Sequence, residues 1–386
     1  MSITSTLISR AREIAPLVAA EAENTDRNGA ISDKVIDAFC EAQLLEILVP
    51  KRFGGHELNY ETMARVVYEI APHCTSTAWV LSFYIGHNFI HSLFPEKSQE
   101  EVFANRPYAL TPGTVAPNFS LTPVDGGYIA NGRSSWNSGS SRCDWFLNNG
   151  LIKVEGQPPT MRCFFVRAKD ANIIDNWNVA GMKGTSSGDI ELKDVFVPEY
   201  HTTETLGLLG GTSPGSLIHK APIYSMPLLP FVLGEVMPVV VGAYRGAAND
   251  FKKLTEERFT TFTSAKVLSK QTAQMRIGHG QTGAALAEAM LENYIAEIDR
   301  TDVDRFKPLE ARAATKSKVS MVTDFCSSGI NYLFKGAGAG AWRNESSLQR
   351  FFRDLNMLTV HGFLDLEVAT ETYGRILVGL PPESPL

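Results

Sequence analysis

The sequence predicts an α+β protein with an N-terminal helical domain, a central antiparallel β domain and a C-terminal helical bundle. Apolar residues recur at helical spacing up to about Asn105, and short apolar runs separated by Gly, Asn and Pro fill the next hundred residues. Long helical patterns return after a Gly-, Ser- and Pro-rich connector at residues 207–230. We therefore predict domains at residues 1–106, 107–215 and 216–386. Strands do not alternate with helices, which excludes a Rossmann or barrel fold.

Each domain contains recognisable elements. The N-terminal residues carry Arg and Glu within their apolar periodicity, so they predict an amphipathic helix and not a secretion signal. Strands are expected near residues 144–147, 162–166 and 189–197. Bundle helices are expected over residues 231–259, 270–299, 309–334 and 346–378. The most apolar stretch, residues 228–244, is interrupted by two prolines and a glutamate and therefore predicts a buried helix, with no membrane partner.

Composition excludes several classes of function. The chain has 386 residues, with 36 basic and 42 acidic side chains and a formal charge of −6, so nucleic acid is not an expected partner. The five cysteines form no C-x-x-C pair, which argues against a zinc site or a disulfide framework. A reducing cytoplasm is the expected location.

Two motifs receive structural explanations. The run at residues 336–341 matches the G-x-G-x-x-A pattern, but a helical segment precedes it where a dinucleotide fold needs a strand. We predict a turn between helices, and hence no nicotinamide site. His87 and His91 lie four residues apart on a predicted helix, yet spacing indicates no third ligand, so we predict no metal. The histidine face of this helix either borders a pocket or packs in the core.

The segment that ends in Trp136 and Ser138 has the composition of a ring-binding strand. In an extended chain these two residues lie on the same side. An aromatic surface beside a hydroxyl donor could hold a flat heteroaromatic ring, although ordinary strand packing has the same composition.

Four segments together resemble the acyl-CoA dehydrogenase superfamily. They are residues 48–55; residues 131–139 with 143–145; residues 181–187 leading to 194–198; and residues 348–354. They occur in the family's order and cover nearly the whole chain. The resemblance implies an acyl-CoA dehydrogenase-like fold, a flavin between the β domain and the bundle, and a homotetramer.

The catalytic position distinguishes two chemistries within this superfamily. Many dehydrogenases carry a glutamate base eight or nine residues beyond an Arg-Asp pair, where this chain has His361 and Gly362. Some dehydrogenases carry the base on an earlier helix, near the position of Glu235. An acyl-CoA dehydrogenase with bound FAD and Glu235 as base is therefore the alternative, and a catalytically silent flavin-binding or assembly protein is a third. Glu235 could also be a buried structural carboxylate.

The closer resemblance is to the two-component flavin-dependent monooxygenases, the group of p-hydroxyphenylacetate hydroxylase and related phenol and indole oxygenases. The shared features are Gly132 with 138–139, the 349–354 segment with His361, and a histidine, His87, seven residues before a Phe-Pro pair. The resemblance implies an oxygenase component that uses reduced FMN or FAD and O2, through a C4a-hydroperoxide, to hydroxylate a small aromatic substrate. A separate NAD(P)H:flavin reductase would supply the reduced flavin.

The resemblance also implies roles for individual residues. Ser138 would bind flavin N5, His87 is the first candidate base and His361 the second, with Asp365 on the same helical face to orient its imidazole. The remaining candidates are cofactor contacts, and these are Trp136, Gly139, Thr185 and Ser186 for the flavin ring and Arg258 and Arg350 for its phosphate.

Overall fold

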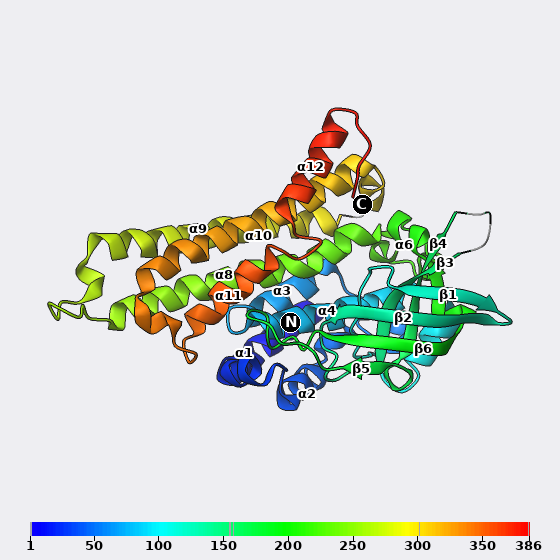
Figure 1. Ribbon diagram of the computed structural model, residues 1–386, viewed down its shortest axis with the longest axis horizontal. Coiled ribbons are helices and arrows are strands. Elements are labelled where there is room, and N and C mark those ends of the chain that lie inside the picture. The colour runs from blue at the N-terminus through cyan, green and yellow to red at the C-terminus, as the bar shows by residue number, and fades with distance from the viewer. Residues whose placement is uncertain (1, 154–155, 157, 301, 385) are drawn as a thin grey trace.

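The computed structural model describes residues 2–153, 156, 158–300, 302–384 and 386. Helices gather at one side of the molecule and the strands at the other, with the long C-terminal helices extending away from the sheet (Figure 1). The N-terminal helices are α1 (Ile3–Asn28), α2 (Asp33–Glu41), α3 (Tyr60–Ile70), α4 (Thr75–His91) and α5 (Glu96–Val102). The predicted amphipathic N-terminal helix is confirmed: Ser2 caps α1, and Gly29, at φ +70°, ends it.

The central region is one seven-stranded sheet. Its strands are β1 (Phe119–Val124), β2 (Gly127–Asn137), β3 (Trp145–Ile152), β4 (Thr160–Arg167), β5 (Asn172–Ile174), β6 (Gly188–Pro198) and β7 (Thr202–Glu204). The spatial order is β5-β6-β2-β1-β3-β4-β7. The sheet is mixed, because β1 and β3 pair in parallel whereas the other neighbours are antiparallel. The three predicted strands are confirmed, but the expectation of a purely antiparallel sheet is wrong at this pair.

Alternation along β3 and β4 joins the sheet to the helices. Trp145 and Phe165 belong to the large core shared with the helices. Phe146 and Phe164, their neighbours in sequence, belong to a smaller core on the opposite face. Successive side chains of a strand point to opposite faces, so one face of the sheet packs on the helical region that contains α4.

The C-terminal region forms the helical bundle. Two short helices, α6 (Thr205–Gly210) and α7 (Pro214–Ile218), lead into α8 (Leu228–Glu257), α9 (Gln271–Ile298), α10 (Leu309–Ala337), α11 (Ser347–Leu358) and α12 (Leu366–Leu377). The predicted helix over residues 346–378 is wrong in one respect, because a turn divides it into α11 and α12. The glycine-rich run 336–341 forms the predicted turn, with Gly338 at φ +78°.

Helix α8 forms the centre of the bundle, as the prediction of a buried helix required. By length and composition α8 could cross a membrane, but 89% of its apolar stretch is buried inside the fold, as in the core helix of a soluble protein. Pro238 cannot donate a backbone hydrogen bond to the carbonyl one turn earlier. The Tyr60 hydroxyl donates to that carbonyl, on Gly234, at 2.7 Å. The Ser82 hydroxyl donates to the Glu235 carbonyl at 2.6 Å, which joins α8 to α4.

Candidate active site

A chain of hydrogen bonds connects α4 with the loops beside the sheet. The indole N–H of Trp79 donates to Ser138 Oγ at 3.1 Å. Ser138 Oγ lies 2.9 Å from Ser187 Oγ, which lies 2.7 Å from Thr185 Oγ1. The Thr185 hydroxyl donates to the Met182 carbonyl at 2.9 Å. All three hydroxyl-bearing residues are buried. Ser138, predicted as a cofactor and catalytic residue, is therefore held in a defined polar network.

The end of β2 separates Trp136 from Ser138. The pairing of β2 with β6 shifts register between Ser134 and Asn137, and Trp136 has φ +72°. Trp136 is 61% exposed and meets the edge of Trp177 with ring centroids 5.3 Å apart, whereas Ser138 is buried. The expectation that these two side chains share one side of an extended strand is wrong, because the bulge breaks the alternation.

Gly139, Thr185 and Ser186 also lie in this region. The Gly139 N–H donates to the Thr185 carbonyl at 2.7 Å. Gly139 has φ +93°, and a Cβ there would lie 2.7 Å from the Tyr84 hydroxyl, so both conformation and space require glycine. Ser186 has φ +46°, and its carbonyl accepts from Ser140 Oγ at 2.7 Å. Ser138 and these three predicted cofactor residues therefore occupy one contiguous site.

Arg353 and Asp354 of α11 hold the turn that carries Thr185. Met182 has φ +51°, and its N–H donates to the buried Asp354 carboxyl at 2.5 Å. Arg353 Nη2 donates to both carboxylate oxygens of Asp26 in α1, at 2.9 and 3.0 Å. Burial raises the pKa of Asp354 to about 6. The pair thus fixes the turn that carries Thr185 to α11 and α1.

His87 lies on α4 with its imidazole buried. Its Nδ1–H donates to the Thr111 carbonyl at 2.5 Å, because a carbonyl oxygen can only accept. Burial lowers the pKa of His87 to about 4, so the ring is neutral near pH 7 and its Nε2 carries a lone pair. Phe83, one turn earlier, stacks on the ring at 5.5 Å. His91 bonds the hydroxyl of the same threonine at 2.9 Å, so Thr111 engages both imidazoles.

His361 lies in the turn between α11 and α12. Its Nδ1 accepts the Phe363 N–H at 3.3 Å, which places the hydrogen of the neutral ring on Nε2. Burial lowers its pKa to about 4. The imidazole meets the Trp79 ring edge-on, with centroids 5.4 Å apart. The predicted orientation by Asp365 is wrong, because the turn interrupts the helical face and Asp365 instead caps α12 by accepting the Val368 N–H at 3.0 Å.

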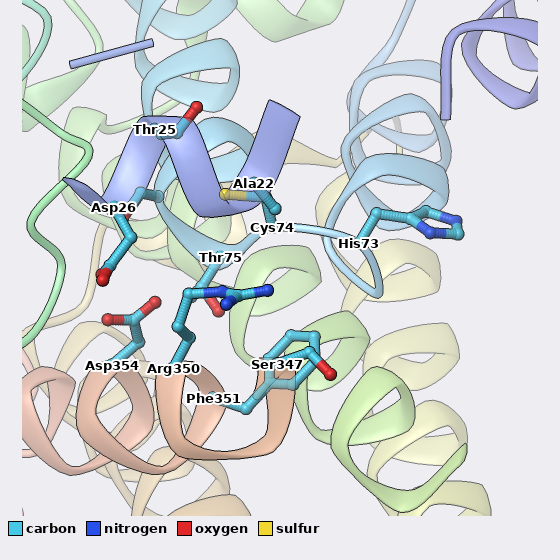
Figure 2. A pocket seen from close by; sticks show the side chains of 11 residues that line it. Ala22, Thr25, Asp26, His73, Cys74, Thr75, Ser347, Arg350, Phe351 and Asp354 are labelled. Carbon is cyan, nitrogen blue, oxygen red and sulfur yellow. The ribbon is translucent and has the colours of Figure 1, made fainter. Parts of the chain in front are cut away.

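The two arginines predicted to bind the flavin phosphate do not lie beside Ser138 and Thr185. Arg258 is at the C-terminal end of α8, not at the start of the next helix, and its guanidinium donates to the carbonyls of Gly336 and Ala337. The turn between α8 and α9 is at the end of the bundle remote from the sheet (Figure 1). Arg350 lines a small pocket with Thr75, Asp26 and Asp354, at the start of α4 (Figure 2). Neither arginine contacts Ser138 or Thr185 among the described hydrogen bonds.

Glu235 is buried against α4. A Cβ on Gly86 would lie 1.7 Å from Glu235 Oε1, so the carboxyl occupies the space that this glycine leaves. Within the described residues Oε1 has no hydrogen-bond partner. Desolvation raises the pKa of Glu235 well above its ordinary value. Burial therefore favours the protonated, uncharged form of this carboxyl, which cannot accept a proton as a catalytic base would.

The residues near Ser138 fit a flavin ring. Trp136 offers an exposed aromatic face, and the buried Asn137 Oδ1, an acceptor, has no partner within the described residues. A planar ring system with donors and acceptors on its edge would cover the Trp136 ring and could donate a hydrogen bond to Asn137 Oδ1. The buried hydroxyls and the positive-φ turns bring backbone and side-chain polar groups to the same place.

The sequence reasoning assigned no site role to Trp79, Phe83, Thr111 or Ser187. The first two precede His87 by eight and four residues, a spacing that places all three on one face of a helix. This spacing was a usable signal. Thr111 belongs to a loop without periodicity, and only the fold brings it to the histidines.

Comparison with known proteins agrees with this architecture. Residues 6–101 match the acyl-CoA dehydrogenase N-terminal domain, and residues 236–366 match the C-terminal domain. The chain is 42% identical to a pigment production hydroxylase of Rhodococcus sp., over all of both chains. The p-hydroxyphenylacetate 3-hydroxylase oxygenase component of Acinetobacter baumannii is 27% identical over 98% of this chain and 90% of its own. The crystal structure of 3-HSA hydroxylase from Rhodococcus sp. RHA1 superposes with a TM-score of 0.90, at 29% identity over 98% of each chain.

The chain belongs to the acyl-CoA dehydrogenase superfamily. Within it, the chain is an oxygenase component of the two-component flavin-dependent monooxygenases. Membership in this group makes it an enzyme that uses reduced flavin and O2. The predicted family and fold are therefore confirmed, and the oxygenase component carries its candidate residues on α4, the β2 end, the 181–187 turn and the α11–α12 turn.

Proposed function

We propose that this oxygenase component hydroxylates a small aromatic substrate of the phenol or indole type. The observation that carries the proposal is the convergence of Ser138, His361 and, through Phe83, His87 on the indole of Trp79. The walls of this region are aromatic, which suits a flat guest ring. The p-hydroxyphenylacetate hydroxylase relative acts on a compound of this class by its name.

The two histidines would have complementary roles. His87 uses Nδ1–H for Thr111 and offers a lone pair on Nε2, whereas His361 accepts at Nδ1 and offers an N–H on Nε2. A phenol hydroxyl or an indole N–H donates a hydrogen, so His87 is the candidate that draws the proton from the substrate as its ring becomes oxidised. His361 can donate to a substrate oxygen. Neutral imidazoles perform both roles without a charge in a buried site.

Ser138 with Gly139, Thr185, Ser186 and Trp136 would hold the flavin ring. When bound, the reduced flavin supplies the activation of O2. The Ser138 hydroxyl belongs to the hydrogen-bond network described above, and its burial excludes bulk water from it. Arg258 and Arg350 stay candidates for the flavin phosphate, and a neighbouring copy in a tetramer could bring Arg258 to a second site.

A separate NAD(P)H:flavin reductase would supply the reduced flavin. The glycine-rich run 336–341 forms an interhelical turn and gives no dinucleotide fingerprint, which supports this division of labour. All five cysteines are free thiols in the structure, which supports a cytoplasmic location. The dehydrogenase alternative is disfavoured, because position 361 is a histidine and burial raises the pKa of Glu235, which favours its uncharged form.

The test combines the purified protein with NADH, a flavin reductase, FMN or FAD, and a panel of phenols and indoles. We expect hydroxylated product only when the reductase is present, with less hydrogen peroxide released when the right substrate is added. Turnover with NADH and no reductase would contradict the two-component proposal. Bleaching of bound FAD by an acyl-CoA thioester would instead establish the dehydrogenase.

We also propose that the protein assembles as a homotetramer. Helices α9 and α10 present exposed apolar side chains on their outer faces, among them Met275, Leu286 and Met290 on α9 and Met321 and Phe325 on α10. A face of this kind on a soluble protein is typical of a subunit interface. Light scattering after size exclusion should give a mass four times the 42.3 kDa of one chain. A monomer mass at micromolar concentration would contradict the proposal.

A further inference from the structure

Trp79 connects the candidate residues of the site to one another. Its N–H bonds Ser138, its ring lies edge-on to His361, and it packs at 4.7 Å on Phe83, which stacks on His87. The side chain is 3% exposed, on the second turn of the 17-residue helix α4. A rigid indole in this position fixes the relative placement of a serine hydroxyl and two imidazoles.

The series of hydrogen bonds from Trp79 to Met182 has a fixed group at each end, and these two ends determine the direction of every bond between them. The Met182 carbonyl can only accept, so the Thr185 hydrogen is directed to it. Ser187 must then donate to Thr185, and Ser138 must donate to Ser187. At the other end the Trp79 N–H can only donate, so it occupies a lone pair of Ser138 Oγ.

The hydrogen of Ser138 consequently has one alternative use. It bonds Ser187 in this structure, and it can rotate to an acceptor on a bound flavin. Ser187 still donates to Thr185 after such a rotation, so no hydroxyl in the chain loses its own donation. The Trp79 N–H keeps the Ser138 oxygen in place in both states, because this bond does not involve the Ser138 hydrogen.

We propose that Trp79 is a positioning residue, whose indole N–H holds Ser138 Oγ so that the Ser138 hydroxyl donates to a ring carbonyl oxygen of the bound reduced flavin, because the reduced N5 carries a hydrogen of its own. The proposal rests on the proposed function, because it assigns a partner to the Ser138 hydrogen. It adds a hydrogen-bond donor to the machinery and predicts that Ser187 competes with the flavin for the same hydrogen.

The experiment is a double-mutant cycle read by affinity. Dithionite-reduced FMN and FAD are titrated anaerobically into wild type, Trp79→Phe, Ser138→Ala and the double variant. We expect Trp79→Phe to weaken binding three- to tenfold, the range of one hydrogen bond. The double variant should bind no more weakly than Ser138→Ala alone, because the N–H acts through Ser138. Additive losses would overturn the proposal, since they would show that the ring acts independently of the serine.

Ser187→Ala provides the opposite test. It removes the competing acceptor and leaves Trp79 and Ser138 in place, so reduced flavin should bind at least as tightly as to wild type. A tenfold weaker affinity would overturn the competition. If Trp79→Phe does not fold, as judged by circular dichroism and melting, the Ser187→Ala result decides.

Hydrogen peroxide release separates this inference from the proposed function. With reductase and substrate, Trp79→Phe should release a larger fraction of the consumed NADH as peroxide, and adding Ser138→Ala should not raise it further. If wild type forms no product but the binding cycle is non-additive, the proposed function fails and the role of Trp79 stands. If wild type hydroxylates and the cycle is additive, the role of Trp79 fails alone.

Discussion

The first prediction concerns the protonation state of Glu235, a property of this chain alone that distinguishes an oxygenase from a dehydrogenase. The carboxyl is 1% exposed, lies against Gly86, and has one oxygen without a hydrogen-bond partner in the described residues. Desolvation raises its pKa well above 4.5. We predict that Glu235→Gln becomes progressively more stable than wild type as pH rises, because glutamine has no charge to lose.

The magnitude follows from proton linkage. Below pH 4.5 the carboxyl is protonated in both folded and unfolded chains, and the stability of wild type does not depend on this group. Above that pH the unfolded chain ionises while the native carboxyl keeps its proton, so wild type loses about 1.4 kcal/mol per pH unit until the native group titrates. The pH at which this growth stops marks the ionisation of the native carboxyl, and for a chain of this length each pH unit below it corresponds to roughly 2 °C in melting temperature.

The assay is a series of melting or urea-unfolding curves at half-unit steps of pH, with Glu256→Gln as the control. Glu256 is on the same helix and about half exposed, so its variant removes a carboxylate that is not buried. A stability difference that does not grow with pH more for Glu235→Gln than for Glu256→Gln would refute the reasoning and return Glu235 as a candidate carboxylate base. Loss of all oxygenase activity in Glu235→Gln, with the fold intact, would also contradict its purely structural role.

The remaining predictions concern the histidines, the turn and the assembly. His87→Ala should keep reduced-flavin binding and lower product formation by about 10²–10⁴-fold, with the consumed NADH recovered as hydrogen peroxide; unchanged coupling would remove His87 from the mechanism. Burial sets the pKa of both His87 and His361 at about 4, so product yield should show no step near pH 6.5 between pH 5.5 and 8, and a clear step there would contradict their neutral state. Asp354→Ala should leave the Met182 N–H unpaired and lower the free energy of unfolding, measured in urea, by about 1–3 kcal/mol. It should also weaken flavin binding, and an unchanged flavin affinity would show that the turn does not need this bond. Met321→Glu places a charge on the outer face of α10 and should lower the mass measured by light scattering, whereas an unchanged mass would exclude this face from the interface.

The periodicity of the sequence predicted the helices and the order of the three regions, because helix and strand patterns depend on local burial. It could not predict where a long helical pattern stops. Residues 346–378 read as one helix, yet a turn that contains His361 interrupts it, and Asp365 caps the next helix. That turn is what brings the imidazole beside Trp79, so the missed break shapes the candidate site.

The candidate site was predicted in its residue types and only partly in its geometry. Ser138, His87 and His361 do converge, but the alternation argument for Trp136 failed at a bulge. A bulge inserts one residue in one strand and depends on the partner strand, which sequence spacing along β2 does not contain. Likewise, the prediction of Arg258 as a phosphate ligand used only the chemistry of its side chain, whereas its bonds to the end of α10 exist only in the folded chain.

Helix α4 explains why these pieces depend on one another. One face of the helix carries Trp79, Phe83 and His87, at intervals of four residues, toward the site. The adjoining face carries Ser82 and Gly86, which bind and accommodate α8 at Glu235. Pro238 frees the Gly234 carbonyl for the Tyr60 hydroxyl of α3, and the absence of a side chain at Gly86 lets α4 and α8 approach. Glu235 thus acts through packing: it sets how closely α4 approaches α8, and thereby where the adjoining face of α4 places the His87 imidazole and the Trp79 indole.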